Sequence, residues 1–224
     1  MTTHSLRRLS VASLLLATLA FTASPASAKT RHREGTVSDD KGHEATIDST
    51  TTRDDDEMTR DTTVTGKDGK TLKSETTRKR DQASGTGTFS RTTTGPNGRS
   101  AQTDGTRKKN ADGSVTTDAM RTGFNGKTET INATTTKTAT GHSTTGTISG
   151  QEGKQGTINS SSKKTSDGFT RDTTVTGPNG KTTERVIGVK KNPDGTYTRT
   201  IETTAPDGKK STRLENYTVT ADGK

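Results

Sequence analysis

Residues 171–182 read RDTTVTGPNGKT, and residues 60–71 read RDTTVTGKDGKT. Each copy joins a run of β-branched residues, which suit a pleated strand, to a four-residue word that ends in glycine. In the later copy Pro178 presets φ for the second position of a type I turn, Asn179 tolerates the third, and Gly180 accepts a positive φ. Such turns join neighbouring antiparallel strands, so the stretch predicts a β-hairpin.

The turn glycines recur along the chain with a period of about 28 residues. The first set comprises Gly42, Gly69, Gly98, Gly126, Gly153, Gly180 and Gly208. The second set lies half a period away and comprises Gly85, Gly113, Gly141, Gly168, Gly195 and Gly223. A turn every ~14 residues leaves roughly ten residues for each strand, which predicts a long series of hairpins.

Side chains alternate between two faces in these strands. Phe169, Arg171, Thr173 and Val175 share one face, which is weakly apolar and basic, whereas the opposite face is mostly Thr. Neither face is apolar enough to fill the core of a β-sandwich. We therefore expect an all-β fold, a repetitive antiparallel meander of hairpins whose turns alternate between two edges. A β-solenoid with one coil per period is the alternative, and the open edges of a meander would allow self-association.

The composition provides few apolar side chains that a folded core could bury. Hydrophobic residues make up 21% of the sequence and aromatic residues 3%, while Thr supplies about a quarter. Chains this poor in apolar residues are often largely disordered, which is a further alternative that only the repeat opposes. The sequence contains no cysteine, so a disulfide framework is excluded.

The first 28 residues have the features of a secretory signal peptide. Arg7 and Arg8 form a positive region, residues 11–21 are apolar, and small residues lead up to a predicted cleavage site between Ala28 and Lys29. The leader is of bacterial type. It predicts an exported protein of the periplasm, the cell surface or the extracellular space, and no later stretch is apolar enough to predict a transmembrane segment.

The rest of the chain divides into two parts. Residues 29–56 keep one turn glycine but are charged and degenerate, and we expect them to fray. Residues 57–224 form the hairpin-repeat region.

The turn words of this region resemble those of other secreted proteins. The stretch NYTVTADGK at residues 216–224 is similar to the repeats of large bacterial YD-type (Rhs-type) proteins, although the Tyr-Asp pair is missing. The words of the GPNGKT type resemble those of short exported bacterial Thr/Gly-rich hairpin-repeat proteins. The resemblance covers residues 57–224 and implies a fold of successive hairpins.

Basic clusters recur in phase with the repeat, a few residues before each turn of the second set. They comprise Arg78, Lys79, Arg80, Arg107, Lys108, Lys109, Lys163, Lys164, Lys190 and Lys191. With a formal net charge of +9, a row of such clusters along one edge would favour a polyanion such as an anionic polysaccharide, extracellular DNA or lipopolysaccharide. The alternative is that these residues only block unwanted strand pairing.

Other candidate sites carry weaker signals. His32, His43 and His142 are far apart in sequence and in repeat phase, so they predict no metal site. The run Asp54–Glu57 could bind calcium, and regular Thr-x-Thr pairs such as the one ending at Thr200 could form an ice-binding array. No Ser or Thr has a His base in a recognisable arrangement, so we expect no catalytic residue and no cofactor.

These observations favour a non-enzymatic exported repeat protein with a structural or adhesive role at the cell envelope or in the extracellular matrix. A polyanion-binding module is the alternative hypothesis. An ice-binding or calcium-binding repeat protein is a more distant one.

Overall fold

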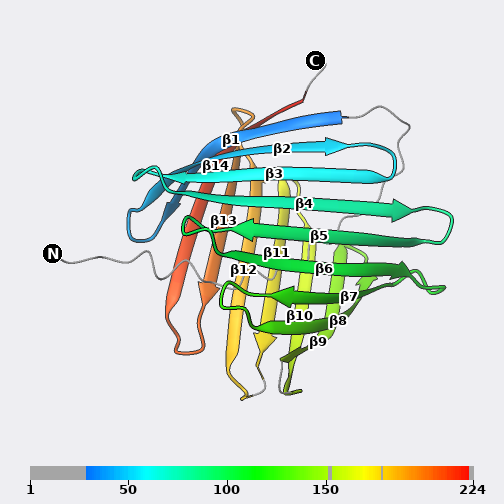
Figure 1. The fold of residues 1–224 in the computed structure, drawn as a ribbon. Coiled ribbons are helices and arrows are strands. Elements are labelled where there is room, and N and C mark those ends of the chain that lie inside the picture. Colours follow the sequence, from blue (N-terminus) through cyan, green and yellow to red (C-terminus); the bar gives the residue numbers. More distant parts are fainter. Residues whose placement is uncertain (1–28, 151–152, 178, 222–224) are drawn as a thin grey trace.

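The computed structural model describes residues 29–150, 153–177 and 179–221, and this part of the chain is all-β (Figure 1). Its fourteen strands follow one another as an antiparallel meander, which confirms the prediction and excludes a solenoid for the described residues. The strands are β1 (Lys29–Asp39), β2 (Glu44–Arg53), β3 (Glu57–Gly66), β4 (Thr71–Asp81), β5 (Thr86–Thr94), β6 (Ser100–Lys109), β7 (Val115–Thr122), β8 (Thr128–Lys137), β9 (Gly141–Gly150), β10 (Gln155–Lys164), β11 (Gly168–Thr176), β12 (Thr182–Lys191), β13 (Tyr197–Thr204) and β14 (Lys210–Ala221).

The turns have the geometry that their residues predict. Gly98 has a φ of 75°, and its N–H donates to the carbonyl of Gly95 over 3.0 Å. The Gly95 N–H in turn donates to the carbonyl of Arg99 over 2.8 Å, which begins the ladder of the hairpin. Gly180 repeats this arrangement with a φ of 73°, while Pro178 lies outside the described residues.

The sheet closes on itself, which the sequence did not predict. β1 pairs antiparallel with β14, with Thr36 directly opposite Asn216, so the fourteen strands form a closed barrel. Within the described strands no edge is left unpaired. Self-association through open sheet edges therefore loses its structural basis.

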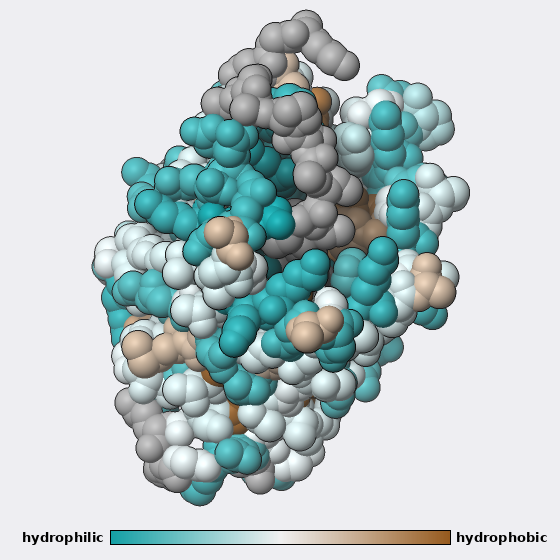
Figure 2. All heavy atoms as spheres, turned by 90° about the vertical axis from the view of Figure 1, so that its right-hand side faces the viewer, coloured by the Kyte–Doolittle hydropathy of each residue, from teal (hydrophilic) through white to brown (hydrophobic). Residues whose placement is uncertain are grey.

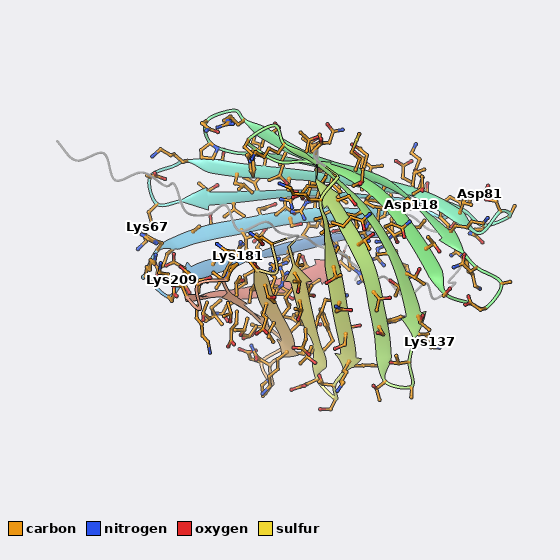
Figure 3. The ribbon with its side chains drawn as sticks, turned by 90° about the horizontal axis from the view of Figure 1, so that it is seen from below. Lys67, Asp81, Asp118, Lys137, Lys181 and Lys209 are labelled. Carbon is orange, nitrogen blue, oxygen red and sulfur yellow. The ribbon has the colours of Figure 1, made fainter. Side chains whose placement is uncertain are left out.

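The two sets of turns lie at opposite ends of the barrel. We name the end with the turns after β1, β3, β5, β7, β9, β11 and β13 the PNG end, because its turns include the Gly-Pro-Asn-Gly words. The terminal end carries the turns after β2, β4, β6, β8, β10 and β12, together with the beginning of β1 and the end of β14. Lys67, Lys181 and Lys209 mark the PNG end, whereas Asp81 and Lys137 lie at the terminal end (Figure 3).

The barrel interior is packed with a mixture of apolar and hydroxyl side chains. Strands β2–β8 cross the direction of β10–β14 (Figure 1). Ile131 and Ile158 are 3% and 1% exposed, and Thr135 shares a hydrogen bond of 2.8 Å with Thr144. Since inward hydroxyls satisfy one another, few apolar residues are needed. The inward face therefore does not form the core of a β-sandwich but lines the interior of a closed barrel.

The side of the molecule that carries the turns after β2, β4 and β6 is largely hydrophilic. Figure 2 shows a side of the molecule on which hydrophilic and near-neutral side chains predominate and apolar ones are scattered.

The charged segment 29–56, which we expected to fray, supplies β1 and β2 and so completes the barrel. The predicted leader, including Ala28 at the cleavage site, lies outside the described residues.

Candidate functional site

Arginines line the inside of the barrel. Residues directly opposite one another in neighbouring strands share a face of the sheet, and every second residue of a strand returns to it. Arg78 lies opposite Met58 and Arg171 lies opposite Ile187, and both of these partners are buried. The arginines placed on the inward face in this way are Arg31, Arg33, Arg53, Arg60, Arg78, Arg80, Arg91, Arg107, Arg121, Arg171, Arg185, Arg199 and Arg213.

Carboxylates on the same face are few. In the strands that the structure describes, the inward carboxylates are Asp39, Glu129 and Glu215. Asp39 and Glu129 lie near the PNG end of their strands, so the terminal half of the interior depends on Glu215. The interior therefore has a large excess of positive charge.

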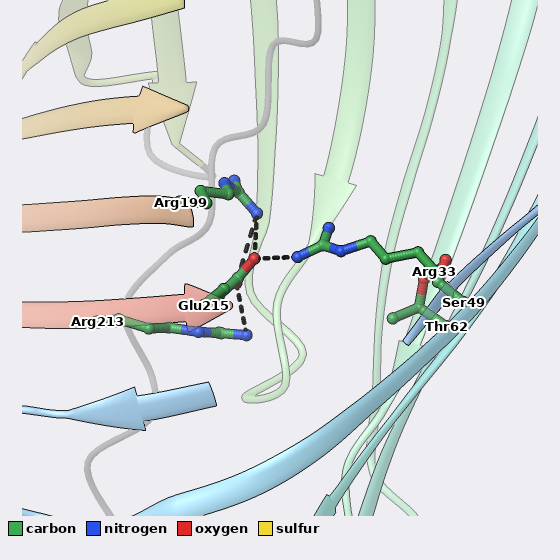
Figure 4. A network of polar contacts seen from close by, with 6 residues as sticks. All are labelled: Arg33, Ser49, Thr62, Arg199, Arg213 and Glu215. Atoms are coloured by element: carbon green, nitrogen blue, oxygen red, sulfur yellow. Dashed lines mark hydrogen bonds and ion pairs between the residues drawn. The ribbon is translucent and has the colours of Figure 1, made fainter. Parts of the chain in front are cut away.

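Glu215 is the centre of the most connected group in the interior (Figure 4). Its side chain is 1% exposed, and its carboxylate accepts hydrogen bonds or ion pairs from Arg33, from Arg199 over 3.2 Å and from Arg213 over 2.9 Å. Burial alone would raise the pKa of Glu215, but the three guanidinium groups outweigh it and hold the pKa below its ordinary value. Glu215 is therefore ionised at neutral pH.

Several other inward arginines are bound by neutral groups. The Nε–H of Arg60 donates to the Thr51 hydroxyl over 2.9 Å, and the Nε–H of Arg91 donates to the Ser74 hydroxyl over 3.0 Å. A hydroxyl satisfies a donor but does not neutralise a charge. These bonds fix the arginine side chains and leave the charge excess in place.

The arginines repel one another across the interior. Burial, followed by repulsion from Arg199 of β13, lowers the pKa of Arg91 on β5. Burial, followed by repulsion from Arg171 of β11, lowers the pKa of Arg107 on β6. Arginines from the two crossing sets of strands thus face one another, although each of them stays protonated at neutral pH.

Arg78 and Arg185 show the largest shifts. Burial, together with neighbouring arginines, lowers the pKa of each to about 10. The Nε and Nη1 atoms of Arg185 are buried and have no hydrogen-bond partner among the described residues. A charged guanidinium group with unused N–H donors is suited to bind two oxygens of one anion at the same time.

Aromatic rings share the interior with the arginines near the terminal end. Tyr197 and Tyr217 are stacked, with ring centroids 5.5 Å apart. The guanidinium of Arg33 lies 3.7 Å from the centroid of Tyr217. A cation at this distance over a ring face is held by the ring's quadrupole, so the rings help to keep the arginines in place.

The basic clusters predicted from the sequence do lie at one end, the terminal end, but not in one row. Because neighbouring residues of a strand point to opposite sides, the clusters are divided between the two faces. Arg78, Arg80, Arg107, Lys109, Lys164 and Lys191 face inward, whereas Lys79, Lys108, Lys163 and Lys190 face outward.

Two of the outward lysines have acidic neighbours: Lys79 lies 3.5 Å from Glu57, and Lys190 lies 3.8 Å from Asp167. The sequence did not indicate Arg33, Arg185, Arg213 and Glu215 as functional residues. Arg33 lies on β1, which meets β14 with Arg213 and Glu215 only on closure of the barrel. The period-two placement of Arg171 and Arg199 on the weakly apolar face is the one sequence signal that points to inward arginines.

The weaker candidates of the sequence remain dispersed. In residues 29–150, 153–177 and 179–221 no group of three or more His, Cys, Asp or Glu side chains is placed to hold a metal ion. Asp56 of the acidic run accepts a hydrogen bond from Gln82, and Glu57 pairs with Lys79. No helix in the described part of the chain has the length and apolar character to cross a membrane.

Comparison of the chain with protein-family models, with curated proteins and with solved structures gives no match.

Proposed function

We propose that this chain is a non-enzymatic, exported binding protein that holds anionic ligands in the arginine-lined interior of its barrel. The observation that carries the proposal is the excess of inward arginines over inward carboxylates. Buried charge is costly unless it is paired, and arginine cannot lose its proton at neutral pH. An interior with this excess of positive charge therefore favours uptake of anions that carry several negative charges.

The chemistry of the arginines favours phosphate, sulfate or carboxylate groups. A guanidinium presents parallel N–H donors that match two oxygens of such a group. Arg78 and Arg185, whose charges no carboxylate of the described chain pairs at close range, are the residues expected to contact the ligand. Anionic polysaccharide, extracellular DNA and lipopolysaccharide all carry groups of this kind.

The terminal end is the expected entrance. The outward lysines Lys79, Lys108, Lys163 and Lys190 surround it, and inward basic residues of the same clusters follow inside. The positive electrostatic field of these residues raises the local concentration of polyanions and makes their association with the protein sensitive to salt.

A structural or adhesive role has less support. The self-association that would serve such a role is expected from open sheet edges, and the described strands close into a barrel. Export itself rests on the leader of the first 28 residues.

The proposal is tested by calorimetric titration of the full chain with tripolyphosphate at low salt. Single substitutions Arg78→Met and Arg185→Met remove one interior charge each while keeping most of the side-chain volume. We expect each to weaken binding by roughly tenfold or more, in line with the loss of one charge-assisted hydrogen-bonded pair.

The matched controls are Lys67→Met and Lys181→Met at the PNG end, which remove the same charge from exposed positions (Figure 3). Screening should keep their effect within about twofold. Equal losses in the arginine and lysine variants, or no binding by the unchanged protein, would contradict an interior anion site.

A further inference from the structure

The inward aromatic residues gather at one end of the barrel. Phe169 is the second residue of β11 and Tyr197 the first residue of β13, so both begin strands at the terminal end. Phe89 lies in the half of β5 near the same end, and Tyr217 pairs with Tyr197 from β14. The mouth of the proposed anion site therefore contains four aromatic rings.

Two of these rings lie along the wall of the barrel because glycines make room for them. A Cβ atom on Gly105 would approach Phe89 Cζ to 2.5 Å, so the Phe89 ring lies directly over the bare backbone. A Cβ atom on Gly35 would come within 2.7 Å of the Tyr217 Cβ atom. The guanidinium of Arg107 lies 5.2 Å from the centre of the Phe89 ring.

Phe169 is the most exposed of the four aromatic residues in the mouth. The residue lies on the inward face and is 39% exposed, so its ring is accessible to a ligand. Lys164 lies directly opposite it on β10, and Arg171 is the next inward residue along β11. An open ring with cations on two sides is suited to a flat ligand that carries negative charge.

We propose that the terminal mouth binds a nucleotide, with the base stacked on Phe169 and the phosphates held by the neighbouring arginines. The proposal rests on the proposed function and names the ligand class of that site. Stacking on an aromatic ring tolerates any base, since every base has a π-face, so the site would not depend on base identity. The nucleotide could be free or the end of a single strand.

A carbohydrate fits this mouth less well. Sugar hydroxyls need acceptors as well as donors, whereas arginine and lysine only donate, which leaves Thr and Tyr hydroxyls as the main side-chain acceptors of the mouth. The one inward carboxylate of the described strands in this half, Glu215, is already bound by Arg33, Arg199 and Arg213. Phosphate oxygens, in contrast, only accept.

The test compares ligands with the same charged group. Adenosine diphosphate and pyrophosphate are titrated calorimetrically into the full chain at one ionic strength, and free adenosine is titrated in parallel. We expect the nucleotide to bind on the order of tenfold more tightly than pyrophosphate, and adenosine weakly. Substitution Phe169→Leu should remove this difference and leave pyrophosphate binding unchanged.

The control is Phe124→Leu, which makes the same change in a turn at the PNG end and should alter neither affinity. A single-stranded decanucleotide that binds more tightly than the mononucleotide, again through Phe169, would indicate a strand as the source of the ligand. The inference fails if the nucleotide binds no better than pyrophosphate, or if a heparin disaccharide rather than the nucleotide depends on Phe169. If pyrophosphate itself does not bind, the proposed function fails as well.

Discussion

Glu215 is the residue on which the terminal half of the interior depends. It is buried at 1% exposure, and three arginines converge on its carboxylate. Removing one partner from a buried ionic group leaves uncompensated charge, which costs far more than the loss of a surface pair. The sequence gives no sign of this role, because Glu215 looks like any other charged residue of a strand.

Substitution Glu215→Gln should therefore lower the free energy of unfolding by about 3–5 kcal/mol. Urea denaturation followed by circular dichroism measures the change. The control is Glu202→Gln on the outward face of β13, which should stay within about 0.5 kcal/mol of the unchanged protein. Similar effects of both substitutions would mean that Glu215 does not hold the arginines together.

The same residue predicts how stability changes with pH. Because the arginines hold the folded-state pKa of Glu215 below its ordinary value of 4.5, its contribution is complete above that pH and is lost as the pH falls through the lower folded-state value. Melting temperatures of the unchanged protein and of Glu215→Gln should converge on acidification below 4.5. A difference that stays constant down to the lowest accessible pH would contradict the assignment.

At the scale of the element, the hairpins are the part of the fold that the sequence predicts best. Turn chemistry is local, so Pro, Asn and Gly at fixed offsets are enough to place a turn. Ten glycines of the two sets have positive φ values, including all seven of the first set.

Gly141 and Gly168 are the exceptions among those predicted turn glycines that the structure describes, and both begin strands. A Cβ atom at Gly168 would lie 1.8 Å from the carbonyl oxygen of Val189, so glycine is needed there for the close approach of β12. The local sequence does not distinguish this requirement from that of a turn.

The turn glycines with positive φ predict a modest loss of stability when one of them is substituted. Gly98 has a φ of 75° and open space around it, so Gly98→Ala tests backbone conformation alone. We expect a loss of about 1–2 kcal/mol, the cost of a left-handed conformation for a residue with a Cβ atom. In the control Gly188→Ala the glycine has equally open space but no positive φ, and the change should be neutral or slightly stabilising. Equal effects in urea denaturation would contradict the turn geometry.

At the scale of the whole molecule, closure of the sheet is what the sequence could not predict. The repeat fixes how each strand pairs with the next, but the pairing of β1 with β14 joins the two ends of the described chain. Closure also buries the basic face of the sheet. This face would be exposed to solvent in an open meander, whereas in the closed barrel it lines the interior. The arginines of that face could be predicted from the sequence; their mutual proximity could not.

The absence of cysteine from the sequence makes closure directly testable. Thr36 and Asn216 lie opposite each other on the outward face, at a separation that a disulfide can span. The double substitution Thr36→Cys and Asn216→Cys should form an intramolecular disulfide under mild oxidation, seen as a shift in non-reducing electrophoresis. The pair Thr36→Cys and Thr145→Cys, on distant strands, should not. Equal yields would contradict the closed barrel.

The central claim is that Arg78 and Arg185, which unlike Arg33, Arg199 and Arg213 form no ion pair with Glu215, bind an external anion rather than stabilise the fold. The folded-state pKa of Arg185 lies below its ordinary value, so its protonated form opposes folding at neutral pH, and two of its nitrogens have no partner in the described chain. The most direct measurement is the free energy of unfolding of Arg185→Met in buffer free of multivalent anions. The account predicts a gain of about 1 kcal/mol or more over the unchanged protein, because a buried unpaired charge is replaced by an apolar side chain of similar volume. A loss of stability would mean that Arg185 is a structural residue and would contradict the claim.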